Sequence, residues 1–397
     1  MLFLAGTALA CGDGEPRMLA GPSPAIESTT EVSPPLAVPT TTPLPIPTIL
    51  PPLAVPGWAV FHRGRDLWIG KLDGSYERAL TRGALGSGFA GEAIDTAGNS
   101  TVYFTALTEQ IGEEPIVEGG IAEVYRQPLD GSSDAERVTK IRVGGERAVL
   151  FRFGDRDAAV SPDGAHLAYA DETGLWLRDL VTGFTRRLLT NRTCDEESPG
   201  LCQSFRWPSW SPDGEWLALA RMHSRGVVAD FIRPLEPVTE YTSEAGGSSR
   251  GWSPSGDQLC VSKGGSNTDG IGLMTARGRG FRDIGAELLH AGRIPAEARI
   301  TTGCVWNADG RWAFSYWHDG RGHDRRIIVL SSDGSFLSST RSALPNSGPV
   351  GWLPDGAGFV LVAGDGEGRP YSRILLLNGS LHELALATDD VVAVLPD

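Results

Sequence analysis

The sequence predicts an all-β protein in which small antiparallel sheets close into a ring, and three observations lead to this fold class. First, a turn phrase of the type Ser-Pro-Asp-Gly returns along the chain, with its clearest copy at Ser211–Gly214. Second, three short strand-like runs follow the copies of this phrase. Third, the last residues of the chain repeat the apolar run that elsewhere precedes the turn.

The chain begins with features typical of an exported lipoprotein. Residues 1–10 are apolar and too short to cross a bilayer, which takes about 20 residues, but they fit the apolar part of a signal peptide. Ala8–Cys11 resembles a bacterial lipobox, in which Cys11 becomes the lipidated N-terminus. Ala8 stands where Leu is usual and no basic residue precedes the run, so simple secretion stays open as an alternative.

A proline-rich segment follows the cysteine. Residues 12–56 contain 12 Pro and few charges, a composition that favours extended polyproline conformations and cannot form a packed core. We therefore expect residues 11–56 to be a lipidated Cys followed by a disordered linker, and residues 57–397 to form one β-domain.

Short strand-like runs fill the rest of the chain. The first unit has runs at 58–62, 66–74 and 78–81, and a later unit repeats them at 167–170, 174–178 and 185–190. Pro fixes φ in the intervening turns, Asp bonds its own backbone, and Gly accepts φ > 0. The copies of the turn begin at Asp95, Ser161, Ser211, Ser253, Asn307 and Leu353. Four strands per 40 to 50 residues is typical of a propeller blade.

The end of the chain supplies the strand that the first unit lacks. Residues 391–397 copy residues 350–355, so we expect them to complete the first blade and hide two sheet edges. This predicts a seven-bladed β-propeller over 57–397. Six blades would require the long second unit, between Asp95 and Ser161, to contain an insertion. Residues 282–292 are expected to form one short helix within a loop.

The motifs resemble those of TolB-type, WD-repeat-like propellers. The resemblance rests on the Trp-Ser-Pro-Asp-Gly turn at Trp210, the Leu-Ala strand after it, and the Leu-Thr pairs Leu80–Thr81 and Leu189–Thr190. It covers about 340 residues and implies a bacterial envelope protein that binds a protein, peptide or sugar. Because such propellers also occur in enzymes, the resemblance is specific for fold rather than function. TolB is not normally a lipoprotein with a Pro-rich stalk, so its partners are not carried over.

Two sets of residues indicate where a site could lie. The turns after the innermost strands are short, whereas the connections expected on the opposite rim, which we call the long-loop face, are longer and are typical of binding surfaces. The predicted loops are 107–122, 141–155, 191–206, 221–229, 262–270 and 282–298. Arg156, Arg206 and Arg250 should lie near the channel mouth on that face, where they could bind carboxylate or phosphate groups or pair with neighbouring acids.

A possible metal site lies in one loop of the same face. His318, Asp319, His323 and Asp324 fall within seven residues and could ligate a divalent ion, although such hairpin tips are commonly solvated. The repeated tryptophans are interpreted as packing between blades rather than as a sugar platform. They are Trp210, Trp252, Trp306 and Trp352.

The cysteines suggest an oxidising compartment. Cys194 and Cys202 share one polar loop and are predicted to form a disulfide, whereas Cys260 and Cys304 lie in expected strands and could be free or bridged.

The net charge of −14 argues against general nucleic-acid binding. No serine-hydrolase elbow, phosphate loop or His-Glu-x-x-His motif occurs in the chain. We therefore expect a non-catalytic, monomeric, envelope-anchored lipoprotein without a cofactor, which binds a protein, peptide or glycan through its long-loop face. The alternatives are a metal-assisted polysaccharide lyase or hydrolase on the same face, and a structural component of an envelope complex.

Overall fold

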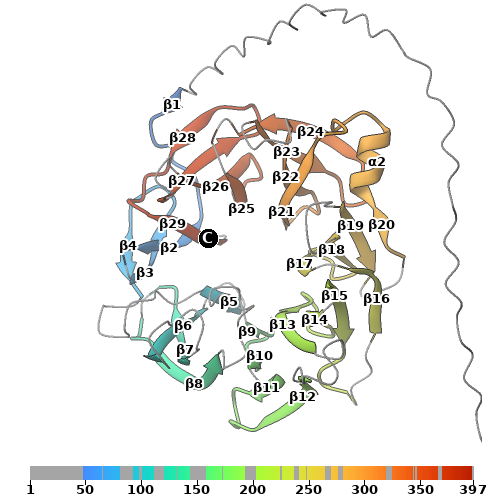
Figure 1. Cartoon of the computed structure of the whole chain (residues 1–397). Coiled ribbons are helices and arrows are strands. Elements are labelled where there is room, and N and C mark those ends of the chain that lie inside the picture. Colours follow the sequence, from blue (N-terminus) through green and yellow to red (C-terminus); the bar gives the residue numbers. More distant parts are fainter. Residues whose placement is uncertain are drawn as a thin grey trace, which may run out of the picture. The chain divides into compact units, whose positions relative to one another are not determined.

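The structure, a computed structural model, consists of seven small antiparallel sheets, or blades, arranged around a central axis within the compact unit that starts at Ile46 (Figure 1). It describes residues 48–64, 66–80, 93–97, 101–110, 120–130, 132–143, 158–171, 173–192, 203–223, 226–236, 241–246, 248–263, 270–275, 280–318, 324–342, 344, 347–364 and 369–395. No helix among these residues is long and apolar enough to span a membrane. The predicted seven-bladed propeller is confirmed.

Each blade has four main strands, which follow in order from the innermost outward. Blade 1 is β29 (Asp390–Leu395), β2 (Trp58–Arg63), β3 (Asp66–Lys71) and β4 (Glu77–Ala79); blade 2 is β5 (Ala93–Ala97), β6 (Thr101–Gln110), β7 (Gly120–Pro128) and β8 (Glu136–Val143); blade 3 is β9 (Ala158–Val160), β10 (His166–Asp171), β11 (Gly174–Asp179) and β12 (Thr185–Thr190). Blade 4 is β13 (Gln203–Trp210), β14 (Leu217–His223), β15 (Gly226–Ile232) and β16 (Tyr241–Gly246); blade 5 is β17 (Ser248–Trp252), β18 (Gln258–Lys263), β19 (Gly270–Thr275) and β20 (Arg282–Asp283). Blade 6 is β21 (Arg299–Trp306), β22 (Trp312–Trp317), β23 (Arg325–Leu330) and β24 (Phe336–Arg341); blade 7 is β25 (Gly348–Trp352), β26 (Gly358–Gly364), β27 (Pro370–Leu376) and β28 (Leu381–Glu383), with β1 (Ile49–Leu50) as a fifth strand.

The ring closes through the last strand of the chain, as predicted. β29 is antiparallel to β2, with Leu395 opposite Trp58 and Ala393 opposite Val60. Val391 is buried on one side of this strand. Because β29 takes the innermost position of blade 1, the N- and C-terminal strands share one sheet and the edges that each would otherwise expose are covered.

The apolar core lies between neighbouring blades rather than at one centre. Leu177 of β11 and Leu219 of β14, for example, belong to one buried cluster that joins blades 3 and 4. Each blade is a thin sheet that cannot enclose its own apolar face, so burial depends on the next blade.

The Ser-Pro-Asp-Gly phrases form the turns that the sequence predicts. The Ser161 hydroxyl donates to Asp163 Oδ1 over 2.5 Å and accepts the His166 N–H over 2.9 Å, while the Ala165 N–H donates to the same carboxylate over 3.0 Å. Gly164 has a φ of 71°, which a side chain rarely adopts. The hydrogen bond from the Ser161 hydroxyl, helped by the Ala165 N–H, lowers the pKa of Asp163.

The segment before the first blade belongs to the ring, contrary to the boundary expected at residue 57. β1 pairs in parallel with β28 on blade 7, and Val55 is buried in the cluster between blades 7 and 1. Gly57 then turns the chain into β2 with a φ of 104°, where a Cβ would lie 2.5 Å from Pro354. Hydrophobic residues within the Pro-rich stretch thus find an apolar surface that composition does not reveal.

The strands extend into two of the predicted loops, 107–122 and 221–229. β6 continues to Gln110, so only residues 111–119 connect it to β7, and β14 and β15 are joined by residues 224–225. In the second of these regions, Arg221 Nε of β14 lies 3.1 Å from the buried Asp230 carboxylate of β15, so an ion pair joins the two strands. The short helix is confirmed as α2 (Ile284–His290), with Asp283 accepting the Ala286 N–H at its start.

Candidate functional site

The four repeated tryptophans hold the inner strands together. Each is the last residue of an inner strand, and its indole N–H donates to a backbone carbonyl of the preceding blade over 2.9 to 3.2 Å. The pairs are Trp210 to Ala159, Trp252 to Ser209, Trp306 to Gly251 and Trp352 to Val305. A cavity of about 370 Å³ opens beside three of them. Since their polar groups are committed to neighbouring blades, the packing interpretation is supported over a sugar platform.

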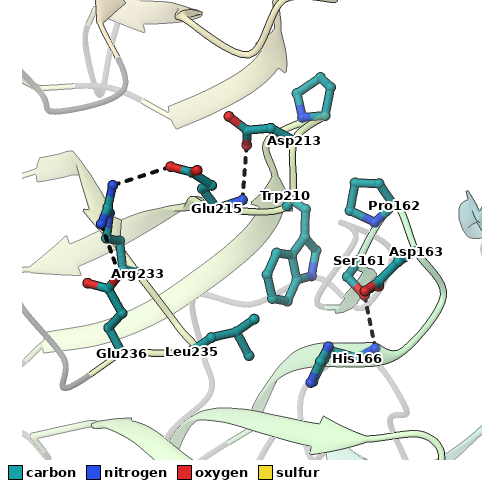
Figure 2. Close-up of a pocket in the computed structure, with 12 residues that line it drawn as sticks. Ser161, Pro162, Asp163, His166, Trp210, Asp213, Glu215, Arg233, Leu235 and Glu236 are labelled. Atoms are coloured by element: carbon teal, nitrogen blue, oxygen red, sulfur yellow. Dashed lines mark hydrogen bonds and ion pairs between the residues drawn. The ribbon is translucent and has the colours of Figure 1, made fainter.

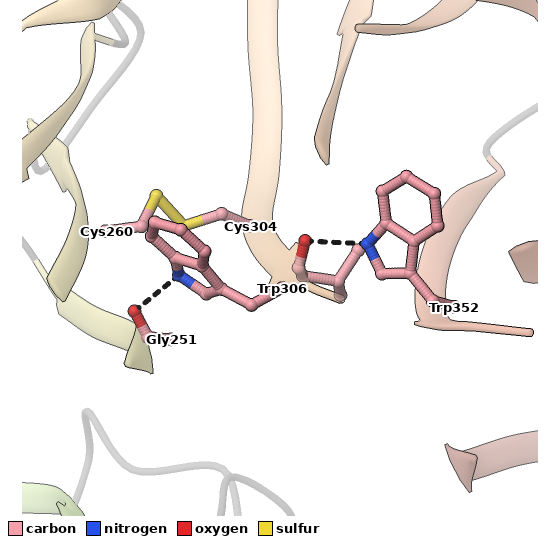
Figure 3. The surroundings of a disulfide bond; sticks show 6 residues. Gly251, Cys260, Cys304, Trp306 and Trp352 are labelled. Carbon is pink, nitrogen blue, oxygen red and sulfur yellow. Dashed lines mark hydrogen bonds between the residues drawn. A yellow bond between two sulfur atoms is a disulfide. The ribbon is translucent and has the colours of Figure 1, made fainter. Parts of the chain in front are cut away.

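A cysteine pair lies beside this column. Cys260 of β18 and Cys304 of β21 have Cα atoms 6.2 Å apart and sulfur atoms placed as a disulfide, next to Trp306 (Figure 3). This pair crosses from blade 5 to blade 6. The other predicted pair, Cys194 and Cys202, lies outside the described residues, as does Cys11.

The three arginines predicted at the channel mouth are only partly described. Arg206 is in β13 with 5% of its surface exposed, and the strand bulges between it and Ser209. Trp207 within this bulge has a φ of 52°, a conformation uncommon for a non-glycine residue. Arg250 lies in β17, where only the backbone is described, and Arg156 falls outside the described residues. Of the three side chains, only that of Arg206 is therefore described, and their grouping stays a prediction.

The proposed metal ligands are also only partly described. His318 donates its backbone N–H to the Asp324 carbonyl over 2.7 Å, while Asp319 and His323 lie outside the described residues. The Asp324 carboxylate accepts from Arg341 over 2.8 Å and lies 3.6 Å from Arg326. In the part of the chain that is described, no three His, Cys, Asp or Glu side chains are grouped as metal ligands.

A pocket lies on the opposite face from the one where binding was expected, among the short turns of blades 3 and 4. It has a volume of about 600 Å³. The inner turns of blades 3 and 4 line one part of it, and the outer turn of blade 4 lines the rest (Figure 2). Its lining residues are Ser161, Pro162, Asp163, His166, Trp210, Pro212, Asp213, Gly214, Glu215, Arg233, Leu235 and Glu236. We call this side of the ring the short-turn face.

The Ser, Asp and His in this pocket are not arranged for nucleophilic catalysis. The Ser161 hydroxyl donates to Asp163, and it is the backbone N–H of His166, not the imidazole, that contacts the hydroxyl. Blade 4 repeats the same bonds with Ser211 and Asp213, where Trp216 replaces the histidine. Catalysis of this type needs a base within hydrogen-bond reach of the hydroxyl, so the repeated bonds indicate a structural role.

The pocket has an excess of negative charge. Four carboxylates line it against the single guanidinium of Arg233. Arg233 lies between two of these acids, 3.3 Å from Glu215 and 2.9 Å from Glu236, and stacks 4.8 Å from the centre of the Trp216 ring (Figure 2). This pocket was not predicted from the sequence, because the turn residues were interpreted as structural only. The signal available was the recurrence of acids at the turn tips with Leu235 between charged residues.

Solved structures share this fold at low sequence identity. A protein from Lactobacillus plantarum matches 86% of this chain and 98% of its own at 14% identity, with a TM-score of 0.52. Prolyl oligopeptidase B from Galerina marginata matches with a TM-score of 0.52 at 10% identity, over 79% of this chain and 45% of its own. This chain thus spans less than half of that peptidase. The putative TolB from Agrobacterium tumefaciens matches 81% of this chain and 99% of its own at 17% identity, with a TM-score of 0.44.

In fold, the protein is a seven-bladed β-propeller of small antiparallel sheets. No protein-family model matches the sequence, and no curated protein matches it either. At these identities the structural likeness extends to the fold alone, so the function has to be argued from the residues of this chain.

Proposed function

We propose that the protein is a non-catalytic binding protein of the bacterial cell envelope, anchored through lipid on Cys11. Its Pro-rich segment separates the anchor from the propeller, and the long-loop face binds a protein, peptide or glycan partner. The protein acts as a monomer and needs no cofactor for this role.

One observation carries the proposal: the two faces of the ring differ in what their connections do. On the short-turn face, inner hairpins turn in three to six residues, and Ser and Asp side chains are used in bonds within the turns. On the long-loop face, residues 144–157 separate β8 from β9, and residues 191–202 separate β12 from β13. Long connections on a rigid scaffold are where binding residues concentrate. Arg206, which is buried beside the bulge of β13, is the described member of the arginines expected at the channel mouth on this face.

The anchor is tested by fractionation of cells that produce the full chain. Changing Cys11 to Ala should release the protein from membranes, because a lipoprotein with its lipids removed has no other anchor in this scheme. A matched control, Ser33→Ala, alters the Pro-rich segment near the anchor and should leave the membrane fraction unchanged. Unaltered membrane association of the Cys11 variant would contradict the anchoring.

The binding face is tested by loop replacement in the full chain. Exchanging residues 193–200 for a Gly-Ser segment of equal length should abolish co-purification of the partner that cross-links to the intact protein in the envelope. The same exchange at residues 378–380, in the turn between β27 and β28 on the other face, should leave that partner bound. A partner retained equally by both variants would remove the long-loop face from the proposal.

A further inference from the structure

The three most exposed large apolar side chains of the described residues lie on two neighbouring turns of the short-turn face. Val181 is 85% exposed, Phe184 66% and Leu235 56%. Val181 and Phe184 belong to the outer turn of blade 3, and Leu235 belongs to the outer turn of blade 4. We call these three residues the turn-face patch. Single exposed apolar residues are ordinary on a surface, but a group of them marks an interaction site.

The two turns of the patch are tied to each other. The guanidinium of Arg186, two residues after Phe184, donates to the backbone carbonyl of Pro234, which precedes Leu235. The turn of blade 3 is further ordered by Asp179, whose carboxylate accepts the N–H groups of Val181 and Thr182 over 2.9 and 2.7 Å. The apolar side chains are therefore displayed on a fixed frame, so a partner does not need to order this backbone on binding.

The acidic pocket adjoins the patch through Leu235, which lines both (Figure 2). Asp163, Asp213, Glu215 and Glu236 surround the apolar floor made by Trp210. The bonds that lower the pKa of Asp163 keep this carboxylate charged below its ordinary range. An apolar centre with a charged rim is the usual anatomy of a protein interface.

We propose that the short-turn face of blades 3 and 4 is a second docking site, which binds a segment of a partner protein that combines apolar and basic residues. Apolar side chains of the segment pack on the turn-face patch, and Lys or Arg side chains enter the pocket among its carboxylates. This site is independent of the long-loop face and of the anchor.

The charge of the site argues against two other occupants. A surface of anionic lipid headgroups would be repelled by the four carboxylates of the pocket. A second copy of this chain carries a net charge of −14 and would bring like charge to the same site. A basic partner segment meets complementary charge instead.

The test uses the purified full chain and three labelled ten-residue peptides, followed by fluorescence anisotropy. One peptide alternates Leu and Arg, the second has Glu in place of Arg, and the third has Ser in place of Leu. We expect saturable binding of the first peptide alone, weakened by added salt. No binding of the Leu-Arg peptide up to about 1 mM, the weakest affinity of interest, overturns the proposal, and so does equal binding of all three peptides.

Matched variants separate the patch from the overall charge of the protein. Leu235→Ser and Phe184→Ser should each weaken binding of the Leu-Arg peptide by about tenfold, because each loses the burial of one large apolar side chain. Leu337 of β24 has a similar exposure, 50%, but lies on blade 6, so Leu337→Ser should leave binding unchanged. Equal weakening by Leu337→Ser overturns the proposal, as does a concentration-dependent dimer that Leu235→Ser abolishes.

Failure of this test is distinguishable from failure of the proposed function. The patch variants leave Cys11 and residues 193–200 intact, so anchoring and capture through the long-loop face are measured on the same proteins.

Discussion

Blades 4 to 7 and blades 1 to 3 are built on the same sheet but differ at one position, the residue before the turn phrase. In blades 4 to 7 this residue is a tryptophan that donates its indole N–H to the preceding blade. The corresponding residues of blades 1 to 3, taken as those before each copy of the turn phrase, are Val394, Ile94 and Val160. The tryptophan half therefore has a directional bond across each of its interfaces, and it also contains the Cys260 and Cys304 pair.

The two halves of one repeat fold are therefore stabilised by different interactions. The aliphatic half contains the closure between β29 and β2, and its blade 2 has a buried carboxylate paired with cations of the next strand. In blade 2 the buried Glu123 carboxylate accepts from the Tyr125 hydroxyl over 2.5 Å and lies within 3.0 Å of both Arg137 and Lys140. Local opening follows the weakest set of contacts, so we expect the aliphatic half to exchange its amide protons faster.

Truncating one tryptophan should cause the largest loss of stability among these variants. Trp352→Ala removes a side chain that is 6% exposed and its bond to Val305, at a cost of about 3–5 kcal/mol in the free energy of unfolding. Val160→Ala, at the matched position of blade 3, should cost much less. Urea unfolding measures both. Equal losses would show that the tryptophans add nothing beyond ordinary core packing.

Removing the cysteine pair should have the next largest effect. The bond closes a loop across 44 residues, and the chain-entropy model gives about 2–4 kcal/mol for bridges of this kind. The double variant Cys260→Ala with Cys304→Ala should lose this amount relative to the oxidised protein. Reduction of the unaltered protein should bring its unfolding midpoint close to that of the variant. Alkylation of both thiols in the exported protein before reduction would contradict the bond.

Changing a tryptophan to phenylalanine should separate the contribution of the indole hydrogen bond from that of ring packing. Trp210→Phe keeps an aromatic ring but loses the donor to Ala159, so the free energy of unfolding should fall by about 1–2 kcal/mol. The expected readout is faster amide exchange at the interface of blades 3 and 4, with the interface of blades 6 and 7 unchanged. Uniform acceleration over all blades would mean that the bond acts on the whole ring.

Low pH should destabilise the aliphatic half, and we expect this effect on the free energy of unfolding to be the smallest of those considered. The Tyr125 hydroxyl, with Lys140 and Arg137, lowers the pKa of Glu123 to about 2. A carboxyl with a lowered pKa stabilises the fold fully above its unfolded pKa, near 4.3, and this contribution is lost as the pH falls toward 2. Glu123→Gln should therefore cost about 1 kcal/mol at pH 7, and this difference should shrink as the pH falls below 4. A difference independent of pH would assign the effect to packing.

The repeat phrases made the ring predictable, since Pro, Asp and Gly in those turns have few other conformations available. The closing strand followed from one copied run, 391–397. The pocket was not predictable, because Arg233 and Asp163 line one cavity only when blades 3 and 4 are placed side by side. Likewise, Val55 has no helical or alternating pattern around it, and its burial depends on a surface supplied by residues far along the chain. The periodicity of the sequence predicts the strands within one blade, but it does not predict a pocket that forms between two blades.

The short parallel pairing of β1 with β28 has a mechanical consequence. Any pull on the chain ahead of Ile49 first loads these few hydrogen bonds at the outer edge of blade 7 and the buried Val55 behind them. Tension reaches β2 and its pairing with β29 only after these contacts have broken. The contacts of β1 and Val55 thus protect the closing pair of strands from force applied at the N-terminal side of the ring.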